Sequence, residues 1–190
     1  MRILSADYET SGLDQNRHAP VTLGLAVMEE GEVIDSHEWL FSPPMKDGKI
    51  TREYDICALK INGVTWKQIE SGQSIASVMS EVTEFAKDFK VSDATGTAVN
   101  APFDFGWYST CLFLGGSWNQ HLRRFETFKP PLTGPWQCVR LMAVNALNLD
   151  RYDLDTVSAH FGMSRDGSAH GATEDAILAG RIYHALTVKS

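Results

Sequence analysis

The sequence predicts one mixed α/β domain spanning residues 1–190. Near its start, three strand patterns follow one another with short turns, at residues 2–8, 20–29 and 33–41, which is typical of an antiparallel meander. A further short apolar segment, at residues 95–99, comes directly before a helical pattern and is expected as an inner strand. The chain is long enough for one core and contains no linker or internal repeat, so a single domain is expected.

The other elements follow from apolar periodicity and from breaker residues. Residues 43–54 are polar and interrupted by prolines, so they are predicted to form a loop, and residues 115–135 are predicted to be irregular. The helix expected at 101–114 has Asn100 as its cap and Pro102 in its first turn. A helix ending before Gly162 is expected because glycine suits a left-handed cap. The remaining predictions are helices at about 75–89, 139–147, 154–161 and 172–187, and a short segment at 136–139.

Composition limits the kind of protein. The net charge of −7 is unfavourable for phosphate binding, so any grip on nucleic acid is expected to be weak and short. The start of the chain lacks a secretory pattern, and no apolar run is long enough to cross a bilayer. The three cysteines are odd in number and lack metal-binding spacing, so a reduced, cytoplasmic location is expected.

Two carboxylates, Asp7 and Glu9, lie two residues apart in the first predicted strand. Because side chains alternate faces along a strand, both point to the same side, roughly 6.5 Å apart along the chain. Such like charges repel unless a cation lies between them. An Asp-x-Glu pair is common in acidic proteins, so this motif alone is weak evidence of a site.

Asp175 is a stronger indication, because it lies on the apolar stripe of the last predicted helix, with Leu178, Ala179, Ile182 and Leu186. The helix dipole explains an acid in the first turn but not one that faces the core, where an unpaired carboxylate is costly. A metal ion would remove that cost. Asp104 has the matching place in the helix at 101–114, where the dipole is an equally good explanation. His170 precedes Gly171 and is expected in the loop entering the last helix, where nearby carboxylates would raise its pKa.

Three segments together resemble the motifs of the DnaQ-like (DEDDh) 3′–5′ exonucleases. Residues 7–13, DYETSGL, resemble the first motif, Asp-x-Glu-Thr-Thr-Gly-Leu. Residues 100–104, NAPFD, resemble the second, His-Asn-Ala-x-Phe-Asp, and residues 170–176, HGATEDA, resemble the third, His-x-Ala-x-x-Asp-Ala. Order and spacing agree across nearly the whole chain, so the joint match is specific where no single motif would be.

The resemblance implies an RNase H-like fold, in which a mixed sheet of a three-strand antiparallel meander plus parallel strands is flanked by helices. It implies His170 as general base, and two divalent cations, Mg²⁺ or Mn²⁺, bound by Asp7, Glu9, Asp104 and Asp175. A sister subfamily has tyrosine four residues before the last aspartate, where this chain has Gly171, so the histidine form is favoured. The resemblance also implies contacts with the terminal nucleotide by Thr10, Asn62 and Phe103.

The chain departs from the family motifs at three positions. Ser11 replaces a threonine, Val99 stands in place of the second motif's histidine, and Asn62 replaces another histidine. None of the three is a predicted metal ligand. The departures therefore concern how the terminal nucleotide is held, and not whether the bond can be cut.

The expected function is metal-dependent 3′–5′ exonuclease activity that releases nucleoside 5′-monophosphates from single strands, with DNA as the first expectation. Two cations roughly 3.5–4 Å apart would activate water and stabilise the leaving 3′ oxygen. One alternative is a 3′–5′ exoribonuclease or oligoribonuclease, since no residue indicates a contact with a 2′-OH. A second is a catalytically inert nucleic-acid-binding module of the same fold. A third, an acid cluster neutralised by arginines, is disfavoured because the nearest basic residues in sequence do not accompany the motifs.

The expected partners are the 3′ ends of single-stranded DNA or RNA, and no membrane. Homodimerisation and an unidentified replication or repair partner stay open, as does the role of residues 115–135.

Overall fold

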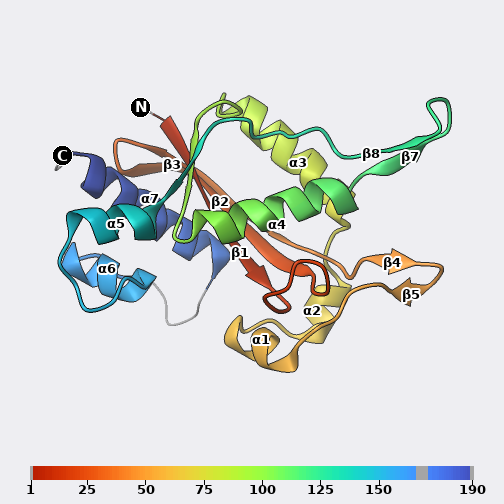
Figure 1. The fold of residues 1–190 in the computed structure, drawn as a ribbon, viewed down its shortest axis with the longest axis horizontal. Coiled ribbons are helices and arrows are strands. Elements are labelled where there is room, and N and C mark those ends of the chain that lie inside the picture. The colour runs from red at the N-terminus through yellow and green to blue at the C-terminus, as the bar shows by residue number, and fades with distance from the viewer. Residues whose placement is uncertain (1, 166–170, 189–190) are drawn as a thin grey trace.

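The computed structural model describes residues 2–165 and 171–188 and is built around a five-stranded mixed sheet (Figure 1). The strand order is β3-β2-β1-β6-β9. β1 (Arg2–Thr10), β2 (Pro20–Glu29) and β3 (Glu32–Leu40) are antiparallel neighbours, whereas β6 (Thr95–Ala98) and β9 (Trp136–Cys138) continue the sheet in parallel. The predicted antiparallel meander with added parallel strands is confirmed.

Helices cover both faces of this sheet, and each face of β1 contributes apolar side chains to a separate core cluster. Leu4, Ala6 and Tyr8 on one face pack with α3 (Ile75–Asp88) and α4 (Ala101–Leu114). On the other face, α7 (Ala172–Val188) lies along β1 and β2, and α5 (Val139–Ala146) and α6 (Leu154–His160) pack on it. The predicted apolar stripe of the last helix is buried in this second layer. Asp7 and Glu9 belong to the face that α7 covers.

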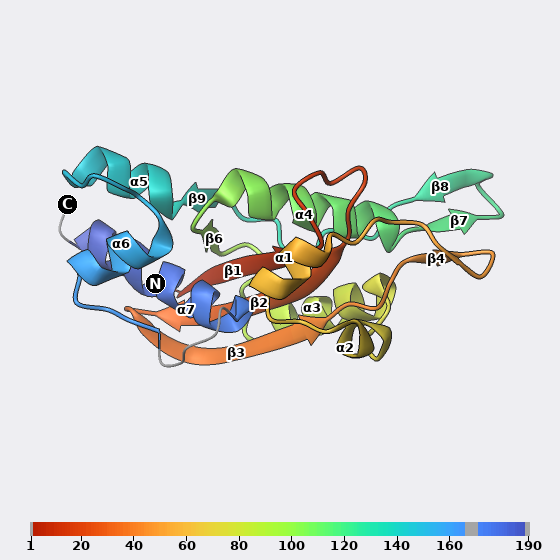
Figure 2. The same ribbon diagram turned by 90° about the horizontal axis from the view of Figure 1, so that it is seen from below.

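Two hairpins lie where the sequence predicts irregular chain. β4 (Met45–Lys46) and β5 (Lys49–Ile50) form one within residues 43–54, and β7 (Ser117–Asn119) and β8 (Arg124–Glu126) form the other within residues 115–135. The loop prediction for 43–54 was therefore wrong over these strands. Asp47 and Gly48 both have positive φ angles, so an Asp-Gly turn closes the first hairpin. Both hairpins project from the same end of the molecule (Figures 1 and 2).

Two short helices, α1 (Ile56–Ile61) and α2 (Trp66–Glu70), were not predicted. Asp55 caps the first by accepting from the Cys57 amide, and Thr65 caps the second in a capping box with Gln68. Helices of five or six residues are too short for apolar periodicity to reveal them. Their caps were the only available sequence signal.

Predicted helix ends are largely confirmed. Pro102 lies in the first turn of α4, and Gly162 follows α6 with a φ of +69°. Asn100 occupies the cap position of α4, but its side chain makes no capping hydrogen bond, so its predicted role was wrong. In the described part of the chain, no helix combines the length and the apolar character needed to cross a membrane.

Candidate active site

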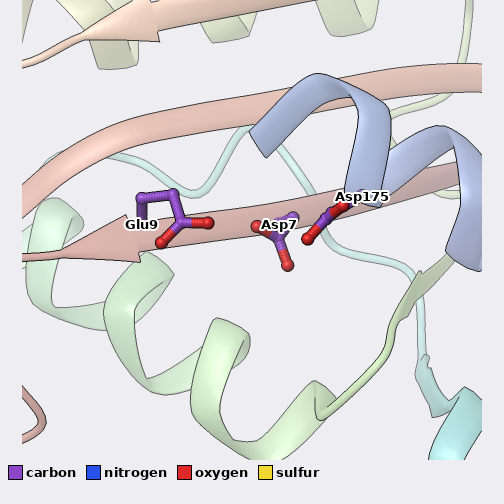
Figure 3. A group of neighbouring side chains, drawn as sticks. All are labelled: Asp7, Glu9 and Asp175. Atoms are coloured by element: carbon purple, nitrogen blue, oxygen red, sulfur yellow. The ribbon is translucent and has the colours of Figure 1, made fainter. Parts of the chain in front are cut away.

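Three acidic side chains from the two ends of the chain meet on one face of the sheet (Figure 3). One carboxylate oxygen each from Asp7, Glu9 and Asp175 can be chosen so that all lie within 4.8 Å of one another. Asp7 and Glu9 project from the same face of β1, and Asp175 projects toward Asp7 from the first turn of α7. Asp175 is 7% exposed, and the other two are half-buried. Like charges at this separation favour a bound cation.

Gly24 in β2 allows the first turn of α7 to approach the sheet closely, next to Asp7. It pairs with Asp7 across the β1–β2 ladder, and a Cβ atom at Gly24 would lie 2.2 Å from the carbonyl carbon of Ala172. No residue with a side chain fits at that distance without moving the helix. The role of Gly24 is not visible in the sequence, because an isolated glycine in a strand indicates a close backbone approach but not its partner.

Asp104 lies beside this cluster, in the first turn of α4, and is 2% exposed. Its Oδ1 accepts a hydrogen bond from the backbone amide of Tyr8 at 3.1 Å. β6 pairs with β1 only as far as Ser5, so the Tyr8 amide lies beyond the parallel ladder, and Asp104 satisfies it. Asp104 is not part of the three-acid group, but it is hydrogen-bonded to the backbone of β1 at Tyr8, between Asp7 and Glu9.

Burial and mutual repulsion make the charged forms of Asp7 and Asp104 costly. Desolvation raises the pKa of Asp7 well above its usual value, and the charges of Asp104, Glu9 and Asp175 raise it further. Burial raises the pKa of Asp104 to about 7, although the Tyr8 amide opposes that change. Carboxylate oxygens are the ligands that Mg²⁺ and Mn²⁺ prefer, and a bound cation would favour the charged form of these groups. The residues present therefore fit a divalent metal.

Arg165 is a basic neighbour of the acids that the sequence analysis missed. Its Nε donates to Oδ1 of Asp175 at 2.6 Å and its Nη2 donates to Oδ2 at 3.1 Å, while Nη1 contacts Asp155. The expectation that no arginine accompanies the motifs was thus wrong. Arg165 is ten residues from Asp175, a separation at which only the fold can reveal the pairing. His170, the predicted general base, lies outside the described residues.

A cavity of about 590 Å³ lies next to Glu9. All three residues predicted to contact the terminal nucleotide line it, namely Thr10, Asn62 and Phe103. Asn62 donates from Nδ2 to the carbonyl oxygen of Thr10 at 3.0 Å, so it joins α1 to the end of β1. Exposed Leu13 and Ile61 add apolar side chains that the sequence analysis did not select, because nothing in their spacing marks them.

The departures from the family motifs have structural explanations. The Ser11 hydroxyl is buried, donates to the carbonyl of Glu53 at 2.6 Å and accepts from the Ala19 amide at 2.8 Å. It therefore holds the chain after β1 in place. Val99 packs against the apolar layer formed by α5, α6 and α7. Of the three departures, only Asn62 lines the cavity.

No protein-family model matches the sequence. Curated relatives are DNA polymerase III PolC-type proteins. That of Thermotoga maritima is 24% identical over 179 residues, or 93% of this chain, and that of Clostridium perfringens is 25% identical over 170 residues, or 90% of it. The chain spans 11% and 10% of the length of these two relatives.

Solved structures show the fold more fully. The nuclease domain of 3′hExo, a DEDDh family member bound to rAMP, has a TM-score of 0.75 at 15% identity, covering all of this chain and 92% of that one. E. coli Exonuclease I with a dT13 oligonucleotide has a TM-score of 0.72 at 15% identity, covering all of this chain and 40% of that one. Exonuclease X with 5′ overhanging duplex DNA has a TM-score of 0.67 at 16% identity, covering all of this chain and 92% of that one. The predicted RNase H-like fold is confirmed, and the chain has the fold of DEDDh exonucleases.

Proposed function

We propose that residues 1–190 form one metal-dependent exonuclease domain of the DEDDh type, which hydrolyses phosphodiester bonds at the 3′ end of single-stranded nucleic acid and releases nucleoside 5′-monophosphates. The observation that carries this proposal is the convergence of Asp7, Glu9 and Asp175, with Asp104 beside them, on the fold of exonucleases. The proteins of similar structure are named as nucleases, which supports the reaction class.

The proposed metal ligands are Asp7, Glu9, Asp104 and Asp175, holding two Mg²⁺ or Mn²⁺ ions. When bound, such ions lower the pKa of a water molecule and stabilise negative charge on the leaving oxygen. The chain contributes position: β1 fixes Asp7 and Glu9, the Tyr8 amide orients Asp104, and Gly24 admits the turn that carries Asp175. His170 is proposed as the general base, because the third motif places it just before α7.

The cavity beside Glu9 is proposed to bind the terminal nucleotide. Its volume of about 590 Å³ lies within the range of small-molecule sites. Phe103 offers an aromatic face for a base, and Leu13 and Ile61 offer apolar contacts. Thr10 and Asn62, which also line the cavity, contribute polar groups.

DNA is the proposed first substrate, because the curated relatives are DNA polymerase III proteins and Exonuclease I is seen with dT13. RNA is the second candidate, because 3′hExo is seen with rAMP. A replication partner is consistent with the PolC-type relatives, although the chain spans only 11% of the first of them. The net charge of −7 favours a short, weak grip on either strand.

The test uses DNA and RNA strands of one sequence, labelled at the 5′ end, with Mg²⁺, with Mn²⁺ and with EDTA. The proposal predicts a metal-dependent ladder of products shortened from the 3′ end. Asp7→Asn should abolish the ladder, whereas Glu174→Gln, an equal change of charge one residue from Asp175, should retain it. Release of the 5′ label as a mononucleotide at the earliest times would contradict the polarity. Intact substrate under every metal condition would favour the inert binding module.

A further inference from the structure

Arg165 donates two hydrogen bonds to the carboxylate of Asp175, a member of the candidate metal site. Nε and Nη2 reach the two different oxygens of Asp175, at 2.6 and 3.1 Å, and Nη1 reaches Asp155. The Arg165 side chain is 15% exposed, whereas that of Asp155 is mostly open to solvent. Arg165 therefore joins the first turns of α6 and α7 and lies largely out of water between them.

This contact uses the same carboxylate that faces Asp7 and Glu9. Bidentate arginine–carboxylate pairs are short and strong, and here both Asp175 oxygens carry a guanidinium donor. A divalent cation at that carboxylate would face the positive charge of Arg165 at close range.

We propose that Arg165 is an exchangeable counter-charge of the metal site. In the metal-free protein it neutralises Asp175, and when a divalent cation binds it leaves Asp175 and stays on Asp155. The inference depends on the metal site of the proposed function and adds how that site is loaded. Arg165 is thus a positioning residue, and its partner Asp155 gives the released guanidinium a nearby anion at the surface.

A purely structural role for Arg165, as a tie between α6 and α7, makes a different prediction. A tie stabilises the protein equally with and without metal. An exchangeable counter-charge stabilises the metal-free protein and opposes metal binding, so its removal has opposite effects on the two quantities. Measurements of stability and of affinity together separate the two roles without any assay of cleavage.

The experiment compares the intact wild-type chain with Arg165→Gln and Arg165→Lys by Mn²⁺ titration calorimetry and by thermal unfolding. Arg165→Gln should bind Mn²⁺ about tenfold more tightly, as expected when a charge-assisted bidentate pair no longer competes. In EDTA its Tm should fall by several degrees, and saturating Mn²⁺ should close that gap. The Mn²⁺ affinity and the Tm of Arg165→Lys should lie between those of the wild type and Arg165→Gln, because lysine keeps the positive charge but cannot donate two parallel hydrogen bonds to one carboxylate.

Arg151→Gln is the matched control, because Arg151 forms an exposed ion pair with Asp153 beside α6. It should bind Mn²⁺ as the wild type does. An unchanged or weaker affinity in Arg165→Gln, an equal loss of Tm with and without Mn²⁺, or equal tightening in Arg151→Gln would overturn the exchange and leave the proposed function standing. Absence of Mn²⁺ binding to the wild type would overturn both.

Discussion

Asp104 and Asp175 occupy matching places, each in the first turn of a helix and each buried, yet their charges are held in different ways. Asp104 accepts from the backbone amide of Tyr8, which belongs to the central strand. Asp175 is held by the side chain of Arg165. A backbone donor cannot leave without breaking the sheet, whereas a side chain can rotate away. One acid is therefore fixed by the fold, and the partner of the other can be exchanged.

Neutralising either acid tests whether the two share one chemical role. Asp104→Asn and Asp175→Asn should each lower kcat/KM by about a thousandfold or more, because a lost metal ligand removes several kcal/mol of transition-state stabilisation. Steady-state cleavage of a 5′-labelled strand measures the effect. Glu174→Gln is the control on the same turn as Asp175. Near-normal activity in Asp104→Asn alone would show that Asp104 only orients β1.

Gly24→Ala should affect the Asp175 side of the site selectively. The added methyl group would push the first turn of α7 away from β2, so we expect a loss of about 1–3 kcal/mol in the free energy of unfolding. The displaced carboxylate should also lower kcat/KM by about 10²-fold, because a shift of about 1 Å can have that effect.

Gly180→Ala is the control for this change. It lies on the same helix, but its new methyl group would meet the side chains of Met28 and Ser5. It should lower stability while leaving kcat/KM near that of the wild type. A similar loss of kcat/KM in both variants would show that general destabilisation, and not the approach at Gly24, is responsible.

The backbone contact of Asp104 should appear as a difference between two substitutions. Asp104→Ala leaves the Tyr8 amide without its acceptor and should lower the free energy of unfolding by about 1–3 kcal/mol. Asp104→Asn keeps an acceptor oxygen and removes a buried charge, so the metal-free protein should be at least as stable as the wild type. Denaturant unfolding in EDTA measures both. Equal stability of the two variants would contradict the role of the amide.

The raised pKa values of Asp7 and Asp104 predict how stability depends on pH. Between about pH 4 and about pH 7 the folded protein binds more protons than the unfolded chain, so the free energy of unfolding of the metal-free protein should fall as pH rises. Mg²⁺ competes with those protons, so the rise in Tm that it causes should grow by several degrees over the same range. Thermal unfolding with Mg²⁺ and with EDTA checks this. A metal effect that shrinks with rising pH would contradict it.

The elements that form the candidate site were the ones best predicted from sequence. Asp7 and Glu9 lie on one face of a strand because side chains two residues apart point to the same side. Asp175 faces the core because it lies on the apolar stripe of its helix. The meander followed from three strand patterns in succession. The three motifs added what periodicity cannot supply, namely that these segments converge.

The features that the sequence analysis missed depend on three-dimensional proximity. Arg165 meets Asp175 only after α6 and α7 pack together, and Gly24 matters only because Ala172 lies above it. The hairpins at 45–50 and 117–126 have strands of two or three residues, too short for alternation to be visible. The Asp47-Gly48 turn was the one local signal that pointed to the first hairpin.

A crystal of the wild-type protein soaked in Mn²⁺ and recorded at the manganese edge tests the central claim most directly. Anomalous peaks within bonding distance of Asp7, Glu9 and Asp175, with the Arg165 guanidinium withdrawn from Asp175, are the predicted result. A fully soaked crystal with no peak among these carboxylates, or with manganese only at other surface acids, would contradict the account.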